Sequence, residues 1–139
     1  MKISYRMVGV ANAQWVVLFD DTQGSSGRLR IAFSDTLNIS PGFGSASQGV
    51  VPEQNCLCTF GLSNFNLVYA SEAAAKAGAR ALRTTLRGAS VHLKYESGTD
   101  AEYYPNGALR SMEFEQQGVS VDYSMTFETQ DVTNTVPTT

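Results

Sequence analysis

GVSVDYSMTFE, residues 118–128, carries the clearest structural signal in the chain. From Val119 to Phe127 every second residue is apolar, and a polar residue stands between each pair. A period of two is typical of an antiparallel strand that buries one face and exposes the other. The stretch therefore predicts a half-buried strand.

The residues before this strand predict its neighbours in a sheet. Residues 108–114 form a second strand candidate, and the short connection that follows suits a hairpin. Asn106-Gly107 accepts the positive φ angles of a tight primed turn, so we expect the chain to reverse there. Residues 91–95 alternate again. The sequence from residue 89 to residue 127 therefore predicts a meander of three or four strands.

One segment has helical periodicity, from residue 71 to residue 87. Ala75, Ala79, Leu82 and Leu86 recur at the spacing of a buried helical stripe. Ser71 is a good N-cap, and Gly88 follows the last turn. We expect one helix here that covers a sheet.

The first half of the chain is also strand-like. Residues 3–7, 29–33 and 56–62 alternate between apolar and other residues, and residues 15–19 are apolar on both faces. The expected fold is mainly β (α+β): an antiparallel β-sandwich or barrel flanked by one α-helix. Cys56 and Cys58 stand two apart in a strand, cannot readily bridge each other, and are expected to be buried thiols.

Two segments fall outside these patterns. The connection from residue 38 to residue 54 is long for a compact domain, and connections of this length are usually functional or disordered. The C-terminal segment is rich in threonine and has no period. We expect one β-rich domain over residues 1–128 with the long loop 38–54, and an extended tail over residues 129–139.

Composition excludes several classes of function. The chain has 139 residues, of which 17% are charged, and a net charge of −3 without a basic stripe, so a direct grip on nucleic-acid phosphates is not expected. No apolar run is long enough for a signal peptide or a membrane span, so we expect a protein made in a cytoplasm and not held in a membrane.

Candidates for chemistry are few. Glu113 and Glu115 lie on one strand face at a separation that could suit sugar hydrolysis, but charges alternating with Met112 and Phe114 are what a solvated strand face requires. His92 is the sole histidine and is expected on the surface. Neither a nucleotide motif nor a usual zinc set is present, so we expect no catalytic residue, no cofactor and no metal.

Four motifs in the second half of the chain follow one another in an order that can be compared with known families. They are the strand CLCTFGLS (56–63), a helix opening with SEAAAKA (71–77), the strand-turn segment HLKYESGTDAEYYPNGALRSMEF (92–114) and the closing strand GVSVDYSMTF (118–127). This half of the chain resembles small tail proteins of tailed bacteriophages and prophages, of the tail-tube and tail-tip kind. None of these motifs is an active-site signature.

The resemblance implies a structural protein and not an enzyme. Such subunits form rings, commonly sixfold, that stack around a channel for the genome. The expected partners are further copies of the chain and neighbouring tail proteins, with DNA only as non-specific cargo. The expected location is the virion, after synthesis in the host cytoplasm.

Under this interpretation two sets of residues are assigned hypothetical roles. The expected inter-subunit contacts come from the loop and the tail: Phe43, Val50, Val51, Val132 and Val136. The expected channel lining is acidic, so that it repels phosphates: Glu113, Glu115 and Asp122. Two alternatives stay open: a monomeric β-sandwich that binds carbohydrate through Trp15, Tyr103 and Tyr104, and a glycosidase that uses the two glutamates.

Overall fold

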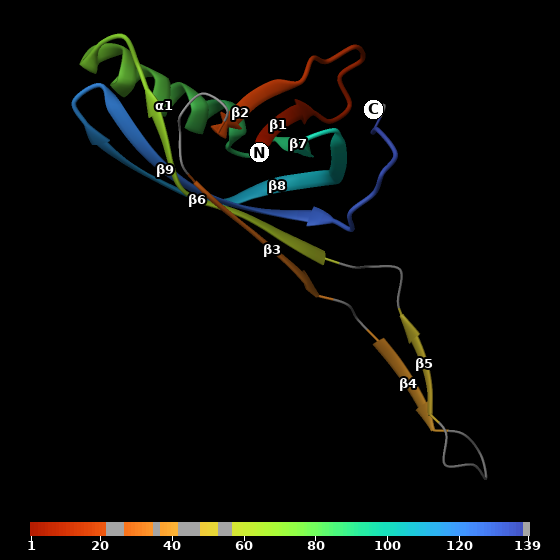
Figure 1. The fold of residues 1–139 in the computed structure, drawn as a ribbon. Helices are drawn as coiled ribbons and strands as arrows, with labels where there is room; N and C mark the ends of the chain where they lie inside the picture. Colours follow the sequence, from red (N-terminus) through yellow and green to blue (C-terminus); the bar gives the residue numbers. More distant parts are fainter. Residues whose placement is uncertain (22–26, 35–36, 42–47, 53–56, 138–139) are drawn as a thin grey trace.

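The computed structural model describes residues 1–21, 27–34, 37–41, 48–52 and 57–137, with the backbone alone for residues 37–41 and 48–52. Seven strands form one sheet in the order β2–β1–β7–β8–β9–β6–β3, and every neighbouring pair is antiparallel (Figure 1). The elements of this body are β1 (Lys2–Met7), β2 (Val16–Asp20), β3 (Arg28–Ser34), β6 (Leu57–Val68), α1 (Glu72–Leu86), β7 (Ser90–Ser97), β8 (Asp100–Gln117) and β9 (Ser120–Gln130).

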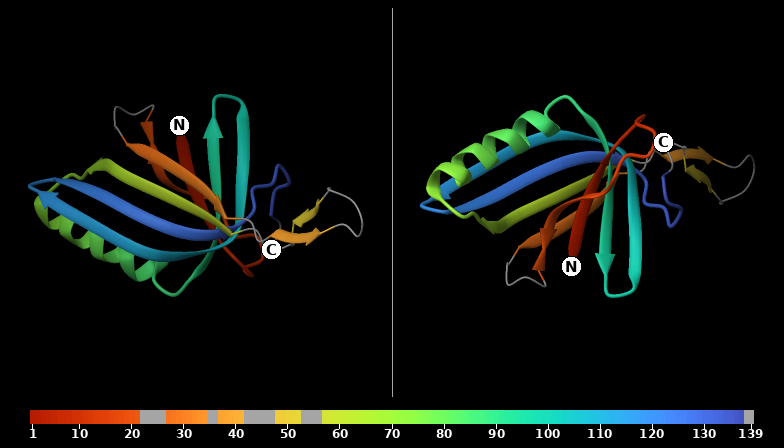
Figure 2. Two further views of the ribbon diagram at one scale, coloured as in Figure 1. Left: turned by 90° about the horizontal axis from the view of Figure 1, so that it is seen from below. Right: turned by 90° about the horizontal axis from the view of Figure 1, so that it is seen from above.

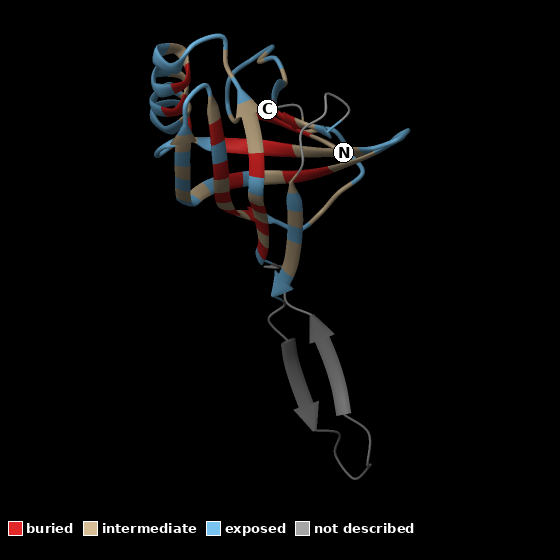
Figure 3. Ribbon diagram, turned by 60° about the vertical axis from the view of Figure 1, so that its left-hand side comes forward, coloured by how far each residue is buried: buried red, intermediate tan, exposed pale blue. Residues whose placement is uncertain are grey.

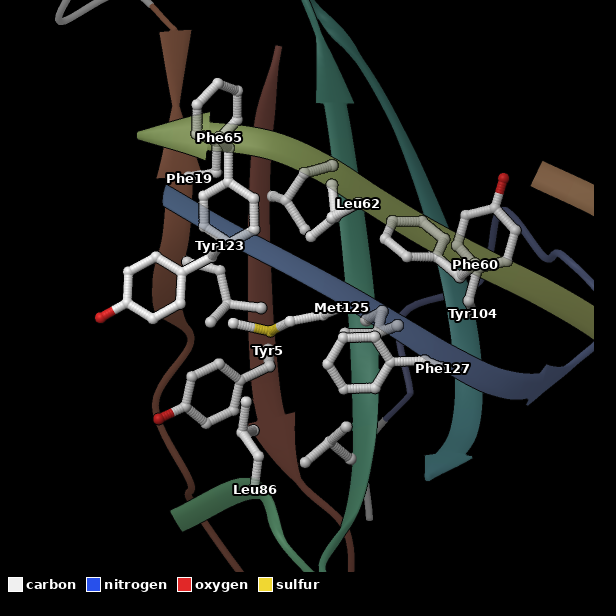
Figure 4. Packing of buried hydrophobic residues seen from close by; sticks show 14 of the residues in the cluster. Tyr5, Phe19, Phe60, Leu62, Phe65, Leu86, Tyr104, Tyr123, Met125 and Phe127 are labelled. Carbon is white, nitrogen blue, oxygen red and sulfur yellow. The ribbon is translucent and has the colours of Figure 1, made fainter. Parts of the chain in front are cut away.

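The sheet curls so that its two halves face each other across an apolar core. Strands β6 and β9 cross over β1, β2 and β7 in the close view of the core (Figure 4). The rings of Phe19 on β2 and Phe65 on β6 meet with centroids 5.4 Å apart. Among the described residues β2 and β3 remain the end strands, so the sheet is not closed into a barrel. The expected β-rich fold with one helix is confirmed.

Strand β9 has the alternation that its sequence predicts. Val121, Tyr123, Met125 and Phe127 are buried, and the residues between them are more exposed. Figure 3 shows such buried and more exposed positions along the strands of the sheet. Strand β9 pairs with β6 on one side and β8 on the other, so its buried side chains stand near the middle of the core.

Strand β8 corrects one prediction. The chain does not reverse at Asn106-Gly107, because β8 runs unbroken through both residues and the reversal lies between Ser97 and Asp100. Asn106 has a φ of 52°, and the pairing of β7 with β8 shifts its register at this point. A bulge that contains a left-handed residue uses the same backbone conformation as a primed turn. The dipeptide therefore bends one long strand instead of ending it.

Helix α1 agrees with its prediction at both ends. The Ser71 side chain caps it by accepting a hydrogen bond from the amide of Ala74, with N and Oγ 3.1 Å apart. Ala75, Ala79 and Leu86 are buried, and the helix packs against β8 and β9 (Figure 2). Small residues on this face let the helix lie close to the sheet.

The long connection contains a second, two-stranded sheet. Strands β4 (Leu37–Pro41) and β5 (Gln48–Pro52) pair with each other as a hairpin, which projects away from the body (Figure 1). Ile39 stands opposite Val50, and Asn38 opposite Val51. Directly opposed residues share a face of an antiparallel pair.

The C-terminal segment folds back on the body. Tyr103 and Thr133 exchange two backbone hydrogen bonds of 2.9 Å, and Nη1 of Arg6 donates to the carbonyl oxygen of Pro137 at 2.7 Å. Residues 131–137 are therefore ordered by contacts with their own chain. Their expected contacts with other subunits remain a prediction.

The interior also contains polar and sulfur-containing side chains, and two of them bear on the predictions. Cys58 is fully buried, as expected, and Cys56 lies outside the described residues. His92 is buried, so the prediction of a surface histidine is wrong. Its Nδ1 accepts a hydrogen bond from the amide of Asn106 at 3.1 Å. The bulge in β8 supplies this partner, which sequence alone does not place beside His92.

Candidate functional site

The candidate site is built on four neighbouring strands, β8–β9–β6–β3, which lie side by side in Figure 2. From residue 109 onwards β8 has left β7, and among the described residues it pairs only with β9. Residues 109–117 with β9, β6 and β3 are called the four-strand layer here. The face of this layer that points away from the core is called the outer face.

The outer face carries the three acidic residues that the sequence assigns to a channel. Glu115 stands directly opposite Asp122, and Glu113 opposite Ser124, in the pairing of β8 with β9. All three carboxylates are exposed, while Phe114 between the two glutamates is half-buried. The structure therefore brings Glu113, Glu115 and Asp122 together on one face.

A shallow depression of about 520 Å³ lies over these carboxylates. Its lining is formed by residues of β6, β8 and β9: Asn64, Glu113, Phe114, Glu115, Asp122 and Ser124. Nδ2 of Asn66 donates to Oδ1 of Asp122 at 2.7 Å and to Oγ of Ser120 at 2.6 Å. Asn66 thus orients one carboxylate and leaves it exposed. Among the described residues no cluster of acidic, histidine or cysteine side chains suits a metal ion.

The arginines of β3 share the outer face with these acids, and sequence reasoning missed them. Arg30 pairs with Gly61, Gly61 with Thr126, and Thr126 with Ser111, so one row crosses all four strands. Arg28 and Arg30 are both exposed. Their alternation with Leu29 and Ile31 is visible in the sequence, but their place beside an acidic strand depends on the pairing order.

The four-strand layer ends on two unpaired edges. Within the part of the chain that the structure describes, β3 pairs only with β6, and residues 109–117 of β8 pair only with β9. Phe33 on the β3 edge is 51% exposed. Unpaired N–H and C=O groups along such edges can bind a strand from another chain.

An apolar groove lies between α1 and the outer strand β2. Its volume is about 340 Å³, and Tyr5, Leu18 and Tyr69 contribute to its lining. Val16 and Val17 on β2 also line it and are 46% and 48% exposed. These valines belong to the stretch that the sequence shows as apolar on both faces, and the structure leaves one part of it exposed.

The residues expected at subunit contacts fall in different places. Val132 is half-buried against the core of its own chain, and Val136 is exposed. Phe43 lies outside the described residues, and Val50 and Val51 lie on β5, whose backbone alone is described. The structure does not test their roles.

The aromatic residues considered for sugar stacking pack within the chain. Tyr103 and Tyr104 are buried, and Oη of Tyr104 donates to Oε2 of Glu102 at 2.9 Å. Trp15 is half-buried and its ring centroid lies 5.8 Å from that of Tyr103, while Nζ of Lys94 lies 5.6 Å from the Trp15 centroid. Burial and the bond to Glu102 raise the pKa of Tyr104. These rings do not form an exposed platform.

Comparison with known proteins gives one structural likeness to report. No family model and no curated protein matches the chain. A chain in the "Cryo-EM structure of the anti-feeding prophage (AFP) baseplate, 6-fold symmetrised" is similar at 11% sequence identity and a TM-score of 0.41. The match covers 95% of this chain and 89% of that chain. Likeness of this degree assigns neither a family nor a function. No helix in the described ranges has the length and apolar character needed to span a membrane.

Proposed function

We propose that the protein is a non-catalytic structural subunit of a phage tail or a tail-like particle. In this proposal copies join through the edges of the four-strand layer into a ring, and rings stack into a tube or join neighbouring tail proteins. The observation that carries the proposal is the pair of unpaired, amphipathic edges on β3 and on residues 109–117 of β8.

The direction of the strands favours a head-to-tail contact. Successive strands of the layer are antiparallel, so β3 and β8 run in opposite directions at its two edges. When a second copy continues the sheet, its β3 therefore lies antiparallel to β8 of the first. A contact between two different surfaces of identical chains produces a closed ring or an open filament. Sixfold closure is part of the proposal and rests on the resemblance in sequence alone.

The outer face gives the ring a polar surface that suits a channel. In the proposed ring this face of every copy points to the lumen and carries Asp122 with serine, threonine and asparagine side chains beside it. Carboxylates repel phosphates, so DNA would pass as non-specific cargo. The proposed location is the virion, after synthesis in the host cytoplasm.

Electron microscopy of the purified protein tests this proposal. We expect rings or tubes in negative stain, and a molar mass in light scattering that rises with protein concentration. The experiment is repeated with the proteins encoded beside this chain, because tail proteins can need a neighbour to start assembly. A protein that stays monomeric at high concentration in both conditions would contradict the proposal.

A further inference from the structure

We propose that Glu113 and Glu115 on β8 of one copy form ion pairs with Arg28 and Arg30 on β3 of the next copy. This inference rests on the proposed function, because it names the side chains by which the two edges recognise each other. Under this inference Glu113 and Glu115 lie at the boundary between subunits, and Asp122 remains on the open wall of the channel.

The β8 edge has an acidic side and an apolar side. Glu113 and Glu115 are exposed on the outer face, and Met112 and Phe114 are half-buried against the core. No ion pair in the described part of the chain includes either glutamate. Because Glu115 faces Asp122 across the strands, like charges repel each other on this edge in an isolated copy.

The β3 edge has the complementary pattern. Arg28 and Arg30 are exposed on the outer face, and Leu29 and Ile31 are half-buried against the core. A Cβ built on Gly61 would lie 4.0 Å from the Cβ of Arg30, so both residues project from the same face. The glycine leaves room beside the Arg30 side chain. In the described residues no ion pair includes Arg28 or Arg30.

One antiparallel register of β3 against β8 of the neighbouring copy gives favourable side-chain pairs on both faces of the layer. It places each arginine opposite a glutamate on the outer face and each aliphatic residue opposite an apolar one on the inner face. Opposed side chains in such a register have Cβ atoms roughly 4.5–5.5 Å apart, which is within reach of an ion pair. The four pairs are Arg28 with Glu115, Leu29 with Phe114, Arg30 with Glu113, and Ile31 with Met112.

The charges also favour a contact of β3 with β8 over a contact between two β3 edges or between two β8 edges. Two β3 edges would bring arginines together, and two β8 edges would bring glutamates together, so both symmetric pairings are disfavoured. Only β3 against β8 joins opposite charges. Charged residues on an edge strand guard against indiscriminate pairing, and here they permit one partner, a second copy of the same chain.

Reciprocal charge reversal tests the ion pairs. One variant carries Arg28→Glu with Arg30→Glu, and the other carries Glu113→Arg with Glu115→Arg. Each variant alone places like charges at every boundary, so we expect association at least about tenfold weaker than that of the parent. The equimolar mixture and a chain with all four changes restore opposite charges, and we expect both to assemble like the parent.

The controls separate this inference from the proposed function. Circular dichroism and thermal unfolding establish that each variant folds. Lys76→Glu with Arg80→Glu, on the exposed face of α1, makes the same change in net charge as the arginine reversal. Assembly is measured by analytical ultracentrifugation and negative stain.

If the parent forms rings and each reversed variant does so equally well, the ion pairs are wrong and the proposed function stands. If the reversed variants do not assemble, and neither their mixture nor the chain with all four changes restores assembly, the proposed ion pairs are also wrong. A parent that never assembles contradicts the proposed function itself.

Discussion

Gly78 shows how one residue couples α1 to the core. A Cβ added there would lie 2.5 Å from Cε1 and 2.9 Å from Cζ of Tyr69. Oη of Tyr69 lies 2.7 Å from Oη of Tyr123, so the two hydroxyls share a hydrogen bond. Burial and this bond raise the pKa of Tyr123. The missing side chain at position 78 is thus what allows the Tyr69 ring to reach the core.

Gly78→Ala is therefore expected to destabilise the protein, against the usual helix preference. Alanine favours a helix interior by about 1 kcal/mol over glycine. Displacing the Tyr69 ring costs roughly 1–3 kcal/mol in overpacking and about 1 kcal/mol for the hydrogen bond. We expect a net loss of about 1–3 kcal/mol in the free energy of unfolding, measured by urea denaturation. Ala77→Gly on the exposed face of α1 provides the reference, because its effect on stability reports helix propensity without a change in packing. A more stable Gly78→Ala variant would show that Tyr69 does not pack on the helix.

The β4–β5 hairpin is an element whose removal should separate folding from assembly. Its strands pair with each other and project from the body, so the core does not depend on them. Deleting residues 38–54 should leave the thermal midpoint of the body nearly unchanged and reduce ring or tube formation. Light scattering and electron microscopy measure assembly. A shortened chain that assembles as readily as the parent would remove the hairpin from the subunit contacts.

A matched pair of variants refines this test without deleting the hairpin. The register places Ile39 and Val50 on one face and Asn38 and Val51 on the other. Serine at positions 39 and 50 should weaken assembly more than alanine at positions 38 and 40, because only the first change removes an apolar face.

Elements governed by local periodicity were predictable from the sequence. Strand β9 and helix α1 bury the residues that their periods of two and 3.6 select. The predicted turn at Asn106-Gly107 is wrong, because a left-handed residue suits a bulge of this kind as well as a primed turn. His92 was misplaced because its partner amide comes from that bulge. The edge arginines were missed because strand order is a long-range property that local patterns do not contain.

In the whole molecule, the carboxylate of Asp122 on the outer face leads to a prediction about DNA. Asp122 lies on β9, between the two edges, so changing it alters neither edge strand, although it stands opposite Glu115 and assembly of each variant is therefore measured first. Asp122→Lys should preserve assembly and make the assembled protein retain DNA, because lysine attracts phosphates that the carboxylate repels. Electrophoretic mobility shifts at low salt measure retention, and Asp122→Asn shows the effect of losing the charge without reversing it. Assembled Asp122→Lys protein that binds DNA no better than the parent would place the outer face away from the channel.

The contact between Arg6 and the Pro137 carbonyl joins the beginning of the chain to its end, and β1 also pairs with the distant β7. Contacts between residues so far apart in sequence form late, because a long loop must close first. During synthesis β1 and β2 can therefore pair with each other before β7, the other neighbour of β1, has been made. The seven-stranded sheet can be completed only after β9, its last strand in sequence, has been synthesised.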